Sequence, residues 1–237
     1  MYYRDLNRHL RELVQSGVRQ IELNHVCGQR YLGTNLNQPV SIDVTGTPGN
    51  DLGAFMNGPE ITVHGNAQDG CGNTMNEGAI IIHGHAGDIV GLSARGGKIF
   101  IKEDVGYRAG IHMKEYHEKK PIVVVGGTAQ DFCGEYMAGG ILILLGLTLK
   151  KGESHRARFV GTGMHGGVIY IRGNIADYQL GKEVGKGKME EQDHVILNKY
   201  ISEFTSYFGG DSAKITAGDF IKLYPRYLRP YGRLYAY

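Results

Sequence analysis

Short apolar stretches recur along the chain at a nearly fixed interval. Each alternates apolar and variable positions and ends at one of seven residues: Gly46, Gly65, Gly84, Glu103, Gly127, Gly146 and Gly173. The interval is 19 residues, except for 24 before Gly127 and 27 before Gly173. Alternation is typical of β-strands, and a unit of this length is too short for a pair of helices. The pattern therefore predicts an all-β solenoid, a single-stranded parallel β-helix of about seven 19-residue turns, here called rungs.

Strand alternation assigns a face to each residue, because positions i and i+2 share a face. Two columns should point inward: Ile42, Ile61, Ile80, Ile99, Val123, Leu142 and Ile169, and then Val44, Val63, Ile82, Ile101, Val125, Leu144 and Ile171. The residues between them should point outward, and this third column is polar at Asp43 and Thr62. It then becomes an apolar stripe of Ile81, Phe100, Val124, Ile143 and Tyr170. Soluble surfaces rarely expose such a stripe, so we expect it to form an interface.

Glycine and Asn/Asp residues also recur at fixed places within the 19-residue unit. We expect them at corners, where φ is positive, where neighbouring rungs approach closely, or where a side chain bonds its own turn. The expected structural positions are Gly46, Gly53, Gly65, Asp69, Gly72, Gly84, Asp88, Gly91, Gly127, Asp131, Gly134 and Gly140.

The two ends of the chain lack the repeat. Residues 1–20 have helical apolar spacing, residues 21–173 form the expected solenoid, and residues 174–192 read as a polar connector. Residues 193–237 should hold a helix with Leu197, Ile201, Phe204 and Phe208 on one face, followed by an extended tail. These segments are the natural covers for the solenoid ends. We expect the helix to cover the apolar stripe, with a partner subunit or a second copy of the chain as the other candidates.

Composition narrows the class of protein. The chain has 37 glycines but only 6 prolines among 237 residues, and 41% of its residues are hydrophobic, which excludes collagen and wholesale disorder. A net charge of +2 is too balanced for a dedicated nucleic-acid or membrane-surface binder. Three cysteines without a CxxC pair, and an N-terminus without an apolar signal segment, favour the reducing cytoplasm.

Four groups of residues invite a chemical interpretation, and each has a structural alternative that we favour. His64 and His83 should stack on neighbouring rungs, but Lys102 continues their column and makes a metal site unfavourable. Cys71 and Cys133 lie three rungs apart, roughly 14 Å, which is too far for a disulfide. The periodic glycines do not form the single loop that a phosphate cradle needs.

The fourth group is a candidate acid–base set of Asp131, Glu135 and Tyr136. Asp131 also belongs to the Asn/Asp column, so a corner role explains it equally well. No catalytic, cofactor-binding or metal-binding residue is therefore predicted for this chain.

Three segments resemble a known family. Residues 46–55 followed by 65–70 resemble the repeated GXGXG motif of the C-terminal domain of the glutamate synthase large subunit. Residues 131–140 are similar to its D-x-x-x-E-Y-M-x-G-G stretch, and residues 159–167 to its later A-G-M-S-G-G stretch. The similarity runs from about residue 21 to residue 173, and more weakly to residue 225.

The resemblance implies a right-handed β-helix with a mostly structural role, bracing a glutaminase part against an FMN-binding synthase part. FMN, iron–sulfur clusters and the nucleophilic cysteine then belong to partner subunits, and the chain looks like the detached version of the domain. Two alternatives stay open. One component of formylmethanofuran dehydrogenase, a metal- and pterin-containing enzyme, has a similar fold, and a free-standing β-helix enzyme is the other alternative.

Overall fold

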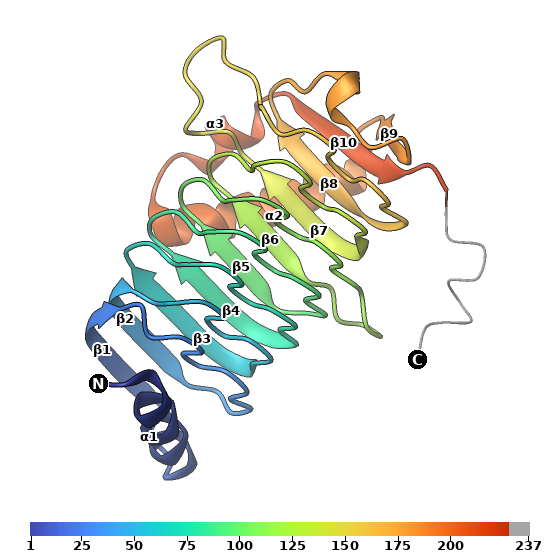
Figure 1. Ribbon diagram of the computed structural model, residues 1–237. Helices are drawn as coiled ribbons and strands as arrows, with labels where there is room; N and C mark the ends of the chain where they lie inside the picture. Colours follow the sequence, from blue (N-terminus) through green and yellow to red (C-terminus); the bar gives the residue numbers. More distant parts are fainter. Residues whose placement is uncertain (228–237) are drawn as a thin grey trace.

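A single large sheet dominates the chain, with helices at its ends and against one face (Figure 1). The computed structural model describes residues 1–227, so the end of the predicted tail lies outside the described residues. The elements are α1 (Tyr3–Gln15), β1 (Gln20–Cys27), β2 (Ser41–Thr47), β3 (Asn57–His64), β4 (Glu77–Ile82), β5 (Lys98–Ile101), β6 (Ile122–Val125), β7 (Ala138–Leu144), β8 (Gly166–Arg172), the 3₁₀ helix η1 (Asp177–Gln179), β9 (Val184–Gly187), α2 (Glu191–Phe208), α3 (Ser212–Thr216) and β10 (Phe220–Pro225).

The strands β1–β8 are parallel and pair in chain order, so the chain forms a β-solenoid. Ile61 lies opposite Ile42 and Ile80, and the same column continues through Ile99, Val123 and Leu142 to Ile169, although β3–β4 and β7–β8 shift register before they reach it. The two inward columns are buried throughout and form one continuous core. The predicted rungs and their register are thereby confirmed, and β1 adds an irregular rung in front of them with a shift after Leu23.

Turns with left-handed backbone close the rungs on the side away from the sheet. Three alternate residues of each rung have positive φ; in one rung these are Asp51 (62°), Gly53 (65°) and Phe55 (57°). Their backbone N–H groups bond to the rungs on either side: that of Gly53 donates to Leu32 O at 2.8 Å and that of Phe55 to Asn73 O at 2.8 Å. The turn wall is therefore hydrogen-bonded from rung to rung, although it contains no regular strand.

The middle residue of each triplet is a glycine because a side chain there would enter the core. A Cβ on Gly53 would lie 2.8 Å from Cδ1 of Ile80 in the next rung. Gly84 and Gly127 have a different reason, since neither has a positive φ; a Cβ on them would collide with the side-chain oxygens of Asn66 and Asp104. Both reasons expected for the glycines thus operate: Gly53 combines a positive φ with a close approach, whereas close approach alone applies at Gly84 and Gly127.

Both ends of the solenoid are covered. Leu10 and Val14 of α1 join the core at the β1 end. At the other end, β10 pairs antiparallel with β8, and β9 pairs antiparallel with β10. The predicted connector over 174–192 therefore contains η1 and β9, and its last two residues begin α2. Strand β9 has few apolar residues and forms through backbone pairing with a distant segment, which local sequence does not reveal.

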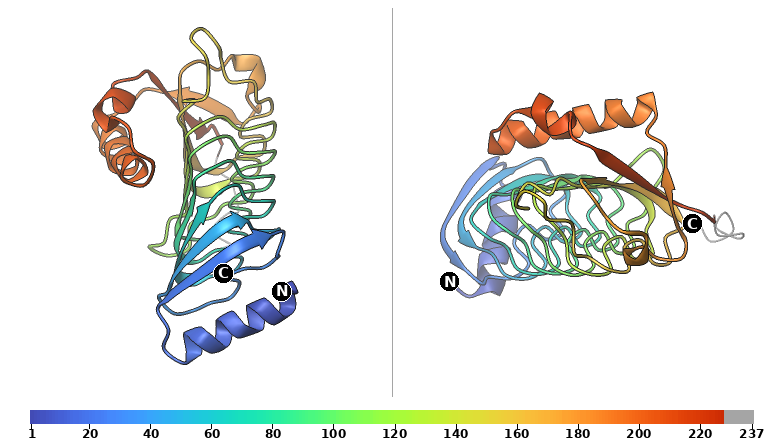
Figure 2. Two further views of the ribbon diagram at one scale, coloured as in Figure 1. Left: turned by 90° about the vertical axis from the view of Figure 1, so that its left-hand side faces the viewer. Right: turned by 90° about the horizontal axis from the view of Figure 1, so that it is seen from above.

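The helix α2 lies against the outer face of the sheet (Figure 2). Leu197, Ile201 and Phe204 form a second apolar cluster with the outward side chains of the later strands. The outward stripe of Ile81, Phe100, Val124, Ile143 and Tyr170 is at most 1% exposed. Four of the five, all but Ile81, belong to the cluster with α2, so the interface expected there is an internal one, between the solenoid and its own C-terminal helix. No helix within residues 1–227 combines the length and apolarity needed to cross a membrane.

Candidate functional site

The aspartates of the corner column bond to the backbone of the following rung. Asp69 Oδ1 accepts the backbone N–H of Asp88 at 2.9 Å, and Asp88 Oδ1 accepts that of Tyr107 at 2.8 Å. Asp131 Oδ1 accepts the N–H of Arg158 at 2.8 Å. These carboxylates link one rung to the next, which is a structural use.

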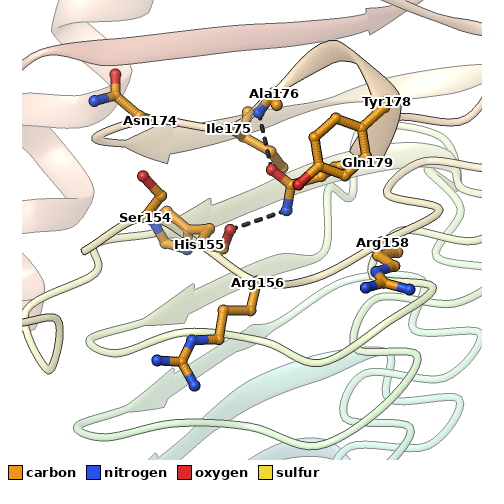
Figure 3. A pocket seen from close by; sticks show the side chains of 9 residues that line it. All are labelled: Ser154, His155, Arg156, Arg158, Asn174, Ile175, Ala176, Tyr178 and Gln179. Atoms are coloured by element: carbon orange, nitrogen blue, oxygen red, sulfur yellow. Dashed lines mark hydrogen bonds between the residues drawn. The ribbon is translucent and has the colours of Figure 1, made fainter.

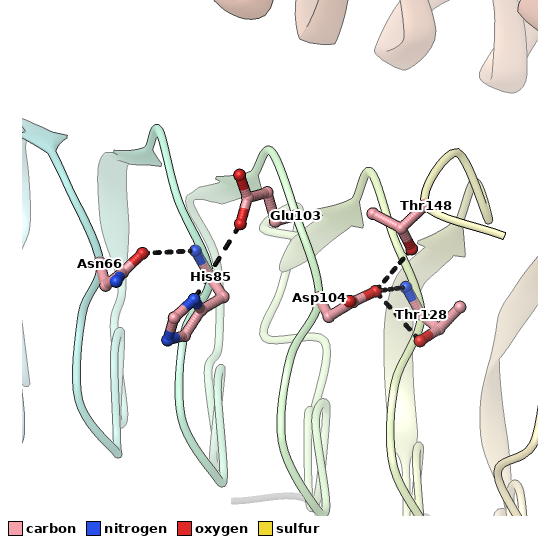
Figure 4. Close-up of polar contacts among 6 residues, drawn as sticks. All are labelled: Asn66, His85, Glu103, Asp104, Thr128 and Thr148. Atoms are coloured by element: carbon pink, nitrogen blue, oxygen red, sulfur yellow. Dashed lines mark hydrogen bonds and ion pairs between the residues drawn. The ribbon is translucent and has the colours of Figure 1, made fainter.

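A second polar row follows the ends of the strands (Figure 4). Asn66 Oδ1 accepts the backbone N–H of His85 at 3.1 Å. Further along, Asp104 Oδ1 accepts three hydrogen bonds: from Thr128 N at 2.6 Å, Thr128 Oγ1 at 3.0 Å and Thr148 Oγ1 at 2.7 Å. A carboxylate oxygen with three donors is fully engaged, so this row also holds rungs together.

The two predicted stacked histidines are in contact. The rings of His64 and His83 stack with centroids 5.1 Å apart, and His64 Nε2 lies 3.2 Å from Asp43 Oδ1. Burial, followed by the nearby His64 and Lys102, lowers the pKa of His83. His83 also meets the ring of Phe208 edge-on at 5.1 Å. Within residues 1–227 no three His, Cys, Asp or Glu side chains gather as a metal site would require.

The two repeated cysteines occupy equivalent core positions on different rungs. Cys71 and Cys133 are both fully buried, and burial raises the pKa of each thiol to about 12. Both are free thiols, as is the exposed Cys27. A buried thiol with a raised pKa is a poor nucleophile, which agrees with a packing role.

The three residues of the candidate acid–base set point to different partners. Asp131 bonds to the backbone of Arg158, and Glu135 Oε2 forms an ion pair with Arg108 Nε at 2.8 Å. The Tyr136 ring stacks on that of His112 with centroids 5.4 Å apart. The structure thus brings no free acid and base together here.

One buried polar cluster was not foreseen. Tyr170 OH donates to Asp193 Oδ1 at 2.6 Å, and Lys222 Nζ donates to Asp193 Oδ2 at 2.8 Å. Burial opposes ionisation of Asp193, but these two donors and the backbone N–H of Glu190 lower its pKa on balance. Burial and the contact with Asp193 raise the pKa of Tyr170. The cluster fastens the start of α2 to β8 and β10.

A polar cavity of about 540 Å³ was also missed. It lies at the C-terminal end of the solenoid and is lined by Ser154, His155, Arg156, Arg158, Asn174, Ile175, Ala176, Tyr178 and Gln179 (Figure 3). The sequence signal was the 27-residue interval before Gly173, because insertions in repeat proteins form loops that often belong to the binding face.

Two comparisons place the chain among known proteins. The GXGXG motif family matches residues 14–231. An uncharacterized protein of Methanocaldococcus jannaschii is 47% identical over 243 residues, which cover 99% of this chain and 93% of that protein. The family match includes the β-solenoid and α2, and the protein thus belongs to the GXGXG motif family, that of the C-terminal domain of the glutamate synthase large subunit.

Proposed function

We propose that the protein is a structural subunit of a split glutamate synthase, which holds the glutaminase part and the FMN-binding synthase part together for glutamine-dependent glutamate formation. FMN and iron–sulfur clusters are then supplied by those partners. The observation behind the proposal is that the repeated polar side chains bond to neighbouring rungs, as Asp69, Asp88 and Asp131 do. Such a body is suited to fixing the distance between partners, and Asp131, Glu135 and Tyr136 of the candidate acid–base set each contact a different group.

The turn wall provides a surface on which a partner protein can bind. Phe159 and Tyr136 are 50% and 47% exposed on it. Phe132 and Phe159 stack with centroids 4.9 Å apart, and the Arg108 guanidinium lies 4.8 Å from the Phe132 centroid. Aromatic and arginine side chains are enriched at the centres of protein interfaces. The stack of Arg108, Phe132 and Phe159 therefore supports a partner on the turn wall.

Reconstitution tests this function. The glutaminase and synthase proteins of the same organism are assayed for glutamine-dependent glutamate formation with and without this chain, and the mixtures are sized by light scattering. We expect a complex containing all three proteins, and coupled activity only when this chain is present. The chain alone should show neither activity nor flavin absorption.

Matched variants locate the contact. Phe159→Ala should weaken assembly about tenfold or more, as expected for an exposed aromatic at the centre of an interface. Val195→Ala, which alters an equally exposed apolar residue on α2, should leave assembly unchanged. Equal coupling without this chain, together with no complex, would overturn the proposal. Co-purification of the native chain with a tungsten or molybdenum enzyme would instead identify it with the formylmethanofuran dehydrogenase component.

A further inference from the structure

The polar cavity lies where the repeat is broken on both sides. The inserted residues before β8 form one wall, and the segment from Asn174 to Gln179, with η1, forms the other (Figure 3). Its volume of about 540 Å³ lies within the range of small-molecule sites. The cavity is therefore a specific feature of one place in the solenoid, whereas the polar rows described above recur along it.

The floor of the cavity is firmly fixed. Gln179 is 4% exposed, and its Nε2 donates to the backbone oxygens of His155 at 2.9 Å and Ala157 at 2.8 Å. Its Oε1 accepts the backbone N–H of Ala176 at 2.9 Å. His155 is 2% exposed and its Nε2 donates to the Arg172 carbonyl at 3.0 Å. These bonds tie the inserted loop to η1 and β8, so the cavity exists before any ligand arrives.

The walls, in contrast, have polar groups without protein partners. Within residues 1–227, the hydroxyls of Ser154 and Tyr178, the amide of Asn174 and the guanidinium of Arg158 make no side-chain hydrogen bond or ion pair. The Nδ1 atom of the buried His155 also has no partner among these residues. All of these groups line one cavity, where the unpartnered Nδ1 of His155 is itself buried.

The charge of the cavity is positive. Arg156 and Arg158 line it, and no carboxylate does. Acidic side chains of the surrounding segments bond to other groups: Asp131 to the backbone of Arg158, Asp104 to Thr128 and Thr148, and the exposed Asp177 to Lys186 at 2.7 Å. Glu153 Oε1 lies 3.6 Å from Arg156, but that arginine side chain is 85% exposed, so the pair is weak. Guanidinium groups bind carboxylates and phosphates through paired hydrogen bonds.

We propose that this cavity binds a small polar anion, a carboxylate or phosphate ester, with Arg156 and Arg158 on its charged group. Ser154, Asn174 and Tyr178 hydrogen-bond to its remaining polar atoms. The firm floor fixes the ligand's position, and the exposed rim lets it enter from solvent. The inference is independent of the proposed scaffold function, because it concerns a site that lies within one chain.

The test is a titration of the full chain at constant ionic strength, with inorganic phosphate in one arm and succinate in the other, followed by calorimetry and by amide NMR shifts. We expect saturable binding in one arm or in both, with shifts concentrated at residues 154–158 and 174–179. Binding of phosphate alone identifies a phosphate ester as the ligand class, and binding of succinate alone identifies a carboxylate.

Two variants make the test specific. Arg156→Gln with Arg158→Gln should weaken binding about a hundredfold, about tenfold for each lost charge-assisted bond. Arg11→Gln with Arg95→Gln removes the same charge from exposed arginines elsewhere and should change binding less than twofold. Asn174→Ala keeps both arginines and should weaken binding severalfold, and thermal melts check that each variant is folded. The absence of saturable binding in both arms, or an equal loss in the Arg11/Arg95 control, would overturn the proposal.

Discussion

The outer face of the sheet has two parts that differ sharply, although they share one inner face and one register. Over β2 and β3, here called the bare part, the outward residues Asp43 and Thr62 are partly exposed, and neither belongs to the apolar cluster beneath α2. Over β5 to β8 the outward residues lie beneath α2. The comparison teaches that the inward columns determine how the rungs stack. A single outward residue in each rung determines whether α2 packs on that rung.

The boundary between the two parts is marked by aromatic contacts. Phe208, at the end of α2, meets His83 edge-on, and His83 in turn stacks on His64 of the bare part. The outward residue changes from Thr62 to Ile81 at the same step along the solenoid. The length of α2 thus matches the extent of the apolar stripe.

The largest expected effect comes from the inner face, which both parts share. Ile82 is fully buried between Val63 and Ile101, so Ile82→Asp places an unpaired charge in the core. We expect a loss of several kcal/mol in the free energy of unfolding, measured by urea denaturation. Ile82→Val, which keeps the position apolar, should cost only about 1 kcal/mol. An aspartate variant as stable as the wild type would contradict the register.

The next effect should be confined to the covered part. Phe204 of α2 is 2% exposed and belongs to the cluster beneath the helix. Phe204→Ala should cost about 3 to 4 kcal/mol through the cavity it leaves. Hydrogen exchange should then rise in α2 and stay unchanged in β2 and β3. Faster exchange throughout the sheet would show instead that the two parts are not independent.

A smaller, pH-dependent effect is expected where α2 is fastened to the sheet. Hydrogen bonds from Lys222 and Tyr170 lower the pKa of Asp193 despite its burial, so its contribution to stability is present above the unfolded value near pH 4 and is lost as pH falls through the lower folded value. Asp193→Asn should therefore be less stable than the wild type at pH 7, by about 2 kcal/mol. Thermal melts should show this gap narrowing steadily below pH 4, and a gap that is constant with pH would contradict the assignment.

The smallest effect belongs to the bare part. Thr62 points outward and is partly exposed, so Thr62→Ile should change the free energy of unfolding by no more than about 0.5 kcal/mol. The apolar stripe of the outward column then begins one rung before Ile81. Chemical denaturation is sufficient to measure the change, and a large shift in either direction would mean that this surface is already in contact with another segment.

The sequence predicts the repetitive half of the structure far better than the irregular half. The register from Ile42 to Ile169 follows from glycine spacing and strand alternation, because every rung repeats the same local rule. The burial of Phe100 and its neighbours beneath another segment follows from strand alternation, which places these large apolar residues on the outer face of the sheet. The left-handed conformation of Phe55 was not predictable, because aromatic residues rarely adopt positive φ and Phe55 does so here with its backbone N–H bonded to Asn73 of the adjacent rung. Strand β9 and the cavity at Arg158 depend on contacts between distant segments.

The reversal of direction at β10 has a consequence for how copies of the molecule behave at high concentration. Stacked parallel strands expose backbone groups at each end, and such ends template the addition of further chains into fibres. Here the final pairing is antiparallel, and the opposite end has the shifted strand β1 beneath α1. Neither end presents the parallel register that an incoming rung would need, so the same covers that complete the core also restrain the molecule from polymerising.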